Sequence, residues 1–259
     1  MRAIIPAALS ATLLAALVPL SASADDNADT LHGFIGGGLG VKPAYSGAKD
    51  NKLSFVPALK VEYGSFFIGG VDTLTAAGWK FYDTDRWQLS LGVGSDLFPR
   101  EESDDDHLKG MGDISVTPRA FVSGTYKNGF FTGGAILTQD IGGNDQGFRF
   151  TTYAHAQWQA TDDLRLFAGP SVSWADSDYM QTQYGVSSAQ SSRSGLQRYD
   201  AGSGLEQVGL ELGADYQITR SWMVGFRTFA SHLEDHASDS PVVEDADQLR
   251  YALFLAWKF

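Results

Sequence analysis

Apolar and polar residues alternate along much of this chain, which is the pattern of β-strands whose two faces meet different surroundings. The alternation is clearest in the segments 148–160, 164–175 and 206–218. In the last segment the apolar positions, each followed by a polar residue or glycine, are Val208, Leu210, Leu212, Ala214, Tyr216 and Ile218. A wet barrel lumen accepts polar residues on the second face, whereas the dry core of a β-sandwich does not. The pattern therefore predicts an all-β fold: a closed antiparallel transmembrane β-barrel with its apolar face outward.

Twelve segments of the chain can be interpreted as strands. They are 33–43, 52–63, 65–71, 75–82, 86–97, 113–126, 129–139, 148–160, 164–175, 206–218, 221–232 and 248–259. The region 65–82 is the least regular, because its glycines and alanines blur two short strands. Ten strands is therefore the alternative count.

The connections between these strands alternate in length. Short polar turns fall at 63–65, 83–85, 127–129, 161–163 and 219–221, and longer connections fall at 44–51, 98–112, 140–147, 176–205 and 233–247. Outer-membrane barrels have short periplasmic turns and long external loops. The alternation thus predicts an even number of strands, with both termini in the periplasm of a Gram-negative bacterium.

The last nine residues predict a membrane-facing strand. Tyr251, Leu253, Leu255, Trp257 and Phe259 lie two apart and share one face. An apolar face with aromatic residues near its edge is typical of a strand that contacts lipid. The same pattern matches the C-terminal strand by which bacterial outer-membrane barrels are recognised for assembly. We therefore expect the barrel assembly machinery, outer-membrane lipid and lipopolysaccharide as partners.

The beginning of the chain predicts export. Residues 1–24 have a positive start at Arg2, an apolar stretch and a small-residue cleavage site at Ala22-Ser23-Ala24. After removal of this signal peptide, we expect residues 25–259 to form a single barrel domain. The net charge of −12 includes Arg2, so this domain carries −13. Such acidity argues against nucleic acid as a partner. The chain has no cysteine, so a hydrogen-bonded barrel has to be stable without disulfides.

Charged and polar residues on the inward face predict a lumen network. Its candidate members are Arg119, Arg149, Tyr153, His155, Arg165, Glu211, Asp215 and Arg227, and Lys60, Glu62 and Arg250 share the same face. Charges of both signs are expected to pair across a lumen of this width and to fill it, since only barrels of about 16 strands are open porins. A narrow pore is the alternative.

No catalytic, metal or cofactor site is predicted. The histidines are His32, His107, His155, His232 and His236, and no Ser nucleophile motif accompanies them. We interpret His155 as part of the lumen network rather than as a catalytic base. His232 and His236 are four apart, a metal-site spacing on a helix, but we expect a loop there. The acidic run 101–106 lacks the spacing of a calcium-binding EF-hand loop and is interpreted as solvated.

The connection 176–205 is too long for an idle link in a compact domain. One interpretation is a flexible external loop. The other is a loop that folds into the barrel mouth or offers a partner surface, with Tyr179, Tyr184 and Tyr199 as anchors and Asp200 beside them.

The loop sequences resemble those of one family of outer-membrane proteins. The matching segments are Tyr184-Gly-Val-Ser-Ser-Ala-Gln190, Ser194-Gly-Leu196, Tyr199-Asp200, Gly204-Leu205, Asp239-Ser-Pro-Val-Val243, Gly110-Met-Gly-Asp-Ile114 and Tyr45-Ser-Gly47. Together they are similar to the MipA/OmpV family. The resemblance implies a small outer-membrane barrel, in one branch a scaffold that links a lytic transglycosylase to a murein synthase. Other members are associated with adhesion, osmotic or antibiotic responses.

From the pattern and the resemblance, we expect a non-enzymatic barrel with a structural or scaffolding role in cell-wall synthesis, with murein hydrolase and synthase as partners. A narrow channel or small-solute uptake porin is the second hypothesis, and a barrel hydrolase is the third. The long loops are expected outside the cell, whereas murein enzymes are periplasmic. A scaffold role therefore has to use the short turns or the start of the mature chain.

Overall fold

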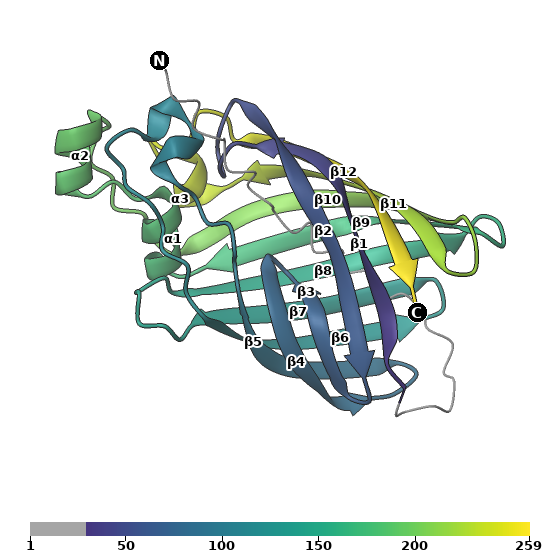
Figure 1. Cartoon of the computed structure of the whole chain (residues 1–259). Helices are drawn as coiled ribbons and strands as arrows, with labels where there is room; N and C mark the ends of the chain where they lie inside the picture. Colours follow the sequence, from purple (N-terminus) through teal and green to yellow (C-terminus); the bar gives the residue numbers. More distant parts are fainter. Residues whose placement is uncertain (1–29) are drawn as a thin grey trace, which may run out of the picture.

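Twelve antiparallel strands close into a barrel in residues 30–259, the part of the chain that this computed structural model describes (Figure 1). The strands are β1 (His32–Pro43), β2 (Asn51–Tyr63), β3 (Phe66–Val71), β4 (Leu74–Asp83), β5 (Trp87–Ser95), β6 (Arg119–Asn128), β7 (Phe131–Asp140), β8 (Phe148–Gln159), β9 (Leu164–Ala175), β10 (Gly204–Gln217), β11 (Trp222–Leu233) and β12 (Asp247–Lys258). Each strand pairs with its neighbours in the sequence, and β1 pairs with β12 to close the barrel. The predicted count of twelve is confirmed, and the alternative of ten is wrong. The predicted signal peptide, residues 1–24, lies outside the described residues.

The side chains alternate between the two faces of the wall as the sequence pattern predicts. In β12, Leu253 is 58 % exposed and Leu255 is 45 % exposed, whereas Ala252, Phe254 and Ala256 between and beside them are buried. The other strands repeat this arrangement, so a band of exposed apolar residues surrounds the barrel. Such a band is the surface that a transmembrane barrel presents to lipid. Within residues 30–259 no helix is long and apolar enough to cross a membrane.

Glycines of β1 line the seam of the barrel, by which we mean the pairing of β1 with β12. A Cβ atom on Gly36 would lie 2.0 Å from the carbonyl oxygen of Leu255 in β12, and one on Gly38 would lie 1.9 Å from that of Leu253. Only glycine permits so close an approach of two backbones. The two ends of the sheet therefore meet along residues that have no side chain to separate them.

The irregular region 65–82 forms two short strands, as predicted. Strand β3 pairs with β2 over only four residue pairs, from Lys60↔Gly69 to Tyr63↔Phe66. The hairpin between β3 and β4 therefore turns back early, at Asp72, whose φ of 52° lies in the left-handed region. This early turn brings Asp72 to a buried partner on β8.

Two predicted strands are clearly shorter than expected: the segment 86–97 gives β5 (Trp87–Ser95), and the segment 113–126 is shortened most. The pattern predicts a strand over 113–126, but β6 begins only at Arg119. Pro118 has no N–H to donate to a ladder, so pairing cannot continue through it. The residues before it bond to other loops instead: Ile114 donates its N–H to the carbonyl of Arg100 (2.9 Å), and Gln146 donates its side-chain amide to that of Ser115 (2.7 Å).

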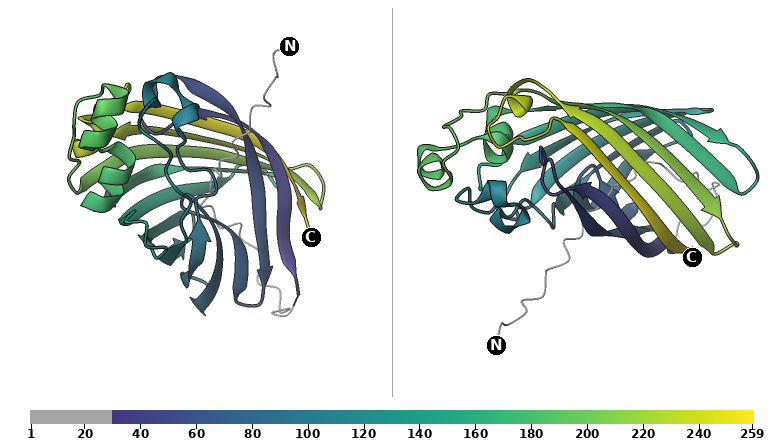
Figure 2. Two further views of the ribbon diagram at one scale, coloured as in Figure 1. Left: turned by 60° about the vertical axis from the view of Figure 1, so that its left-hand side comes forward. Right: turned by 90° about the horizontal axis from the view of Figure 1, so that it is seen from above.

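Long connections and short helices gather at one end of the barrel, and the tight turns and the C-terminus lie at the other (Figures 1 and 2). We call these the loop end and the turn end. The helices of the loop end are η1 (Glu102–Asp104), η2 (Asp106–Leu108), α1 (Ser177–Tyr184), α2 (Ser188–Ser194) and α3 (Asp235–Ser238). Asp176 caps α1 by accepting from the N–H of Tyr179, and Ser187 caps α2 in the same way.

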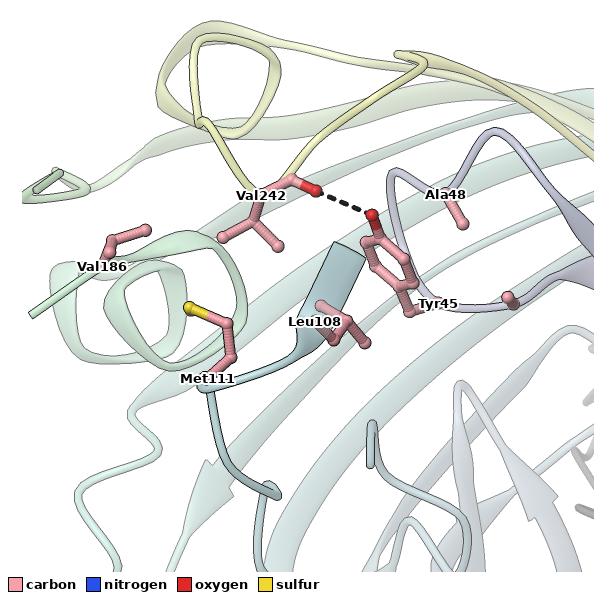
Figure 3. Packing of buried hydrophobic residues seen from close by; sticks show 7 residues of the cluster. Tyr45, Ala48, Leu108, Met111, Val186 and Val242 are labelled. Carbon is pink, nitrogen blue, oxygen red and sulfur yellow. Dashed lines mark hydrogen bonds between the residues drawn. The ribbon is translucent and has the colours of Figure 1, made fainter. Parts of the chain in front are cut away.

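Four of these connections pack into a cap, which we define as residues 44–50, 96–118, 176–203 and 234–246. The cap has its own buried apolar cluster: Ala44, Tyr45, Ala48, Leu108, Met111, Val186 and Val242 (Figure 3). The hydroxyl of Tyr45 donates to the carbonyl of Val242 at 2.9 Å across this cluster. Because each segment buries residues against the others, the loops are fixed by tertiary packing rather than by their local sequence.

Candidate functional site

The lumen holds all eight residues that the sequence places in a network. Six of them are buried on the inward face: Arg119, Arg149, Tyr153, His155, Asp215 and Arg227. Arg165 and Glu211 face the same way and are half-buried. The structure divides these residues among separate groups at different heights in the lumen.

Arg149 is the centre of the group nearest the cap. Its guanidinium donates from Nε to Glu206 (2.5 Å) and contacts the carboxylate of Asp72, which comes from the turn between β3 and β4. It also donates to the hydroxyls of Thr151 and Ser173, each at 2.8 Å. Strands β3 and β8 lie nearly opposite each other in the strand order, so the pair of Arg149 and Asp72 crosses the lumen.

Neither carboxylate of this group is predicted from the sequence pattern. Strict alternation counted back from Val208 places Glu206 on the outer face. The register between β9 and β10 shifts between Leu205 and Gln207, and this irregularity turns Glu206 inward. Asp72 has no local signal, because its partner lies far away in the sequence.

A second group fills the lumen closer to the turn end. The carboxylate of Asp215 accepts from Arg165 at 2.6 Å and from Arg227 at 2.7 Å. The guanidinium of Arg227 lies over the rings of Phe167 and Phe254, 4.8 and 5.2 Å from their centroids. Paired charges and stacked rings thus occupy this level of the barrel.

His155 lies between the two groups and has few polar contacts. Its ring packs against those of Tyr153 and Phe167, with centroids 5.1 and 5.7 Å apart. Nε2 is 3.4 Å from the carboxylate of Glu211, but without hydrogen-bond geometry. Tyr153 shares a hydrogen bond with Thr125 at 3.1 Å. His155 thus packs as part of the barrel wall. Within the described residues, neither of its ring nitrogens has a hydrogen-bond partner.

The lumen wall at the turn end is held by Glu62. Its carboxylate lies 3.0 Å from Lys60, 3.1 Å from Lys80 and 3.1 Å from His32. These contacts join β1, β2 and β4. The cluster therefore stiffens the part of the barrel where β2 and β3 share few ladder pairs.

The predicted loop anchors lie in the cap. The ring of Tyr179 lies beneath the guanidinium of Arg119, 5.6 Å from its centroid. The buried hydroxyl of Tyr184 donates to Glu206 (3.2 Å) and hydrogen-bonds with Ser46 (2.9 Å). Tyr199 donates to the carbonyl of His236 at 2.9 Å, whereas Asp200 is exposed and pairs with Arg198. Burial raises the pKa of Tyr179 and Tyr184 well above the ordinary value of a phenol.

A continuous chain of polar contacts therefore crosses the barrel beneath the cap. It runs from Ser46 and Tyr184 in the cap through Glu206 and Arg149 to Asp72 on the opposite wall. The chain thus links the cap to the lumen wall at the loop end.

Some histidines and acidic residues outside the lumen form separate contacts. His232 hydrogen-bonds with Asp247 at 2.7 Å, and His236 lies on the short helix α3, where the sequence predicted a loop. In the acidic run, Asp104 pairs with Lys52 at 2.5 Å and Asp106 pairs with Lys109. No three His, Asp or Glu side chains of residues 30–259 converge as metal ligands.

The family model and a curated relative carry the same description. The family model described as MltA-interacting protein MipA matches residues 35–259. The MltA-interacting protein of Escherichia coli (strain K12) is 24 % identical over 212 residues, which cover 81 % of this chain and 83 % of the relative. The putative outer membrane protein YiaT of Escherichia coli O157:H7 is 23 % identical over 219 residues, 83 % of this chain and 85 % of the relative.

Solved outer-membrane structures are more distant. The alignment with the NanC porin covers 88 % of this chain and 100 % of the porin chain, at 10 % identity and a TM-score of 0.48. The alignment with OmpT of Vibrio cholerae covers 91 % of this chain and 99 % of the OmpT chain, at 11 % identity and a TM-score of 0.39.

Proposed function

The chain belongs to the MipA family of outer-membrane barrels, and we propose that it serves as a membrane-fixed structural partner of a murein enzyme. The proposal draws on the relative from Escherichia coli that is named MltA-interacting protein. In this role the barrel performs no chemistry. It holds a hydrolase, and with it a synthase, at the inner surface of the outer membrane.

The observation that carries this proposal is the chain of contacts that crosses the lumen at the loop end. A channel needs an unobstructed path, whereas Arg149 and Asp72 pair across the lumen beneath the cap, and Glu206 contacts the same guanidinium. The group around Asp215 and Arg227 fills a second level. A filled barrel supports a structural role better than a transport role.

The short turns are the surface we propose for the partner. Turns of outer-membrane barrels face the periplasm, where murein lies, and the cap then faces outward. The exposed turn residues include Asp162 between β8 and β9 and Arg220 between β10 and β11. This assignment reconciles a periplasmic partner with a protein whose largest loops are external.

We further propose that lipid and lipopolysaccharide contact the apolar outer face. The last strand, with Tyr251, Leu253, Leu255, Trp257 and Phe259, serves as the signal for the assembly machinery. Its exposed apolar face supports both roles.

Site-specific crosslinking in cells tests the partner. A photoreactive residue placed at Asp162 or Arg220 should capture a murein hydrolase of the MltA type. The same residue at Ser192 in α2, an exposed position of the cap, is the matched control and should not. Assembled barrel that gives no such product at either turn, or gives it only at Ser192, contradicts the proposal. A large single-channel conductance in a planar bilayer would contradict the filled lumen independently.

A further inference from the structure

Three cations stand in a row on the lumen face beneath the cap. They are Arg250 on β12, Lys42 on β1 and Lys52 on β2, and these strands are adjacent in the barrel. Lys42 and Lys52 are directly opposite each other in the ladder. On the other side the last ladder pair is Val41↔Tyr251, so Arg250, the next residue, lies beside Lys42. We call these three residues the upper cation row.

Such a row is unfavourable by itself. Neighbouring strands are about 4.7–4.9 Å apart, and like charges directly opposite each other destabilise a sheet. All three residues are partly buried, so water screens their repulsion less than at an open surface.

Among the residues that the structure describes, an ion pair neutralises only one member of the row. Lys52 forms an ion pair with Asp104 at 2.5 Å. Within residues 30–259, neither Lys42 nor Arg250 has a hydrogen bond or a carboxylate at ion-pair distance; the guanidinium of Arg250 lies over the ring of Phe229, 4.6 Å from its centroid. The field of Asp96 and Asp104 reaches Lys42, but neither carboxylate contacts it.

The other strong cations of the upper lumen are already occupied. Arg149 is held by Asp72 and Glu206, and Arg119 donates to the carbonyls of Gln146 and Gly147. Asp72 and Glu206 are thus committed to Arg149, whereas Asp96 accepts from the N–H of Phe98 at 3.0 Å and lies beyond ion-pair distance of Lys42. Lys42 and Arg250 are each only partly buried as whole residues.

An unpartnered hydroxyl lies on the same face. Ser54 is two residues from Lys52 on β2 and opposite Gly40 on β1. Its side chain is buried, 2 % exposed, and its Oγ has no hydrogen-bond partner in the described part of the chain. A buried hydroxyl without a partner is uncommon and points to a missing acceptor.

We propose that the upper cation row binds the phosphate group of a small soluble molecule, or free phosphate. Lys42 and Lys52 supply ammonium donors, Arg250 supplies a planar fork, and Ser54 supplies a hydroxyl donor; phosphate oxygens accept from all of these. The binding converts an unfavourable row of like charges into a stabilising contact. A soluble source fits the location, because the row faces the lumen and not the lipid.

Thermal unfolding of the purified full chain tests this. The barrel is held in a neutral detergent at constant ionic strength, and chloride is replaced stepwise by inorganic phosphate. Phosphate should raise the unfolding midpoint in a saturable way, as ligand binding to the folded state requires. Lys42→Gln should raise the midpoint in chloride, because it removes one of the adjacent like charges, and should weaken phosphate binding about tenfold or more. Lys49→Gln, an exposed position in the cap, should change neither.

An equal midpoint in phosphate and chloride for the unaltered chain overturns the proposal, as does an unchanged phosphate response in Lys42→Gln. If Lys42→Gln does not assemble, Arg250→Gln takes its place. Phosphorus NMR of inorganic phosphate added to the unaltered chain adds a direct measure, and unbroadened lines count against binding. A further arm replaces the detergent by bilayers that contain lipopolysaccharide in chloride. Stabilisation in that arm alone, lost in Lys42→Gln, would overturn the soluble source in favour of a lipid-borne phosphate. The site does not depend on the murein partner, so the two proposals fail separately.

Discussion

The contact between Arg149 and its two carboxylates gives the sharpest energetic prediction. The side chains are almost completely buried, with exposures of 4 % for Arg149, 6 % for Glu206 and 10 % for Asp72. Glu206→Gln keeps the shape and an acceptor oxygen but removes one charge. Because Arg149 still has Asp72, we expect a loss of about 1 kcal/mol, the difference between a charge-assisted and a neutral hydrogen bond. Asp72→Asn should cause a similar loss.

The two changes together should cost more than their sum. The double variant leaves a buried guanidinium without a carboxylate, and removing the partners of a buried charge costs about 3–5 kcal/mol. Adding Arg149→Met to the double variant should recover much of that loss, because the uncompensated charge is then gone. Urea unfolding in neutral lipid vesicles, followed by tryptophan fluorescence, measures each free energy of unfolding.

A surface pair provides the control for this series. Asp200 pairs with Arg198, and both side chains are more than half exposed. Asp200→Asn should therefore change the free energy of unfolding by less than about 0.5 kcal/mol. A double variant of Asp72 and Glu206 that is as stable as either single variant would refute the reasoning, because Arg149 would then not depend on these carboxylates.

Three further predictions concern the seam, the last strand and the cap. Gly38→Val should prevent closure of β1 on β12, seen as loss of the folded band on an unheated gel, whereas Gly124→Ala, where a Cβ has 3.2 Å to its nearest neighbour, should leave that band in place. Trp257→Asp should lower the amount of barrel assembled in cells, because it places a charge on the lipid-facing side, and normal levels would contradict this. Burial raises the pKa of Tyr45 and Tyr184, so the fold favours the neutral phenols. Tyrosine in an unfolded chain has a pKa of about 10, so the cap should keep its full stability below about pH 10 and lose stability as the pH rises further. In a pH titration, tyrosinate absorbance of the folded chain should therefore rise at higher pH than that of the urea-unfolded chain. Titration curves that coincide would contradict this prediction.

Local pattern was sufficient to predict the barrel wall. The strands β8, β9, β11 and β12 lie within a residue of their predicted bounds. Alternation has a period of two and depends only on which side of the wall meets lipid, so each strand carries its own signal. The positions of the tight turns are equally local, because short polar segments interrupt the alternation. The inward direction of Arg149, His155, Asp215 and Arg227 follows from the same rule.

The long-range partners were decided only by the tertiary structure. Asp72 meets Arg149 because the β3–β4 hairpin turns early and the barrel then closes, and neither event can be read from the residues around Asp72. Glu206 faces inward because of one register shift, which breaks the alternation at that point. The cap brings Tyr45, Leu108, Val186 and Val242 together from four separate connections. The sequence by itself thus determined the wall and its two faces, because alternation is local. The closed network inside and the cap above it required the fold, because their contacts exist only between segments that the barrel brings together.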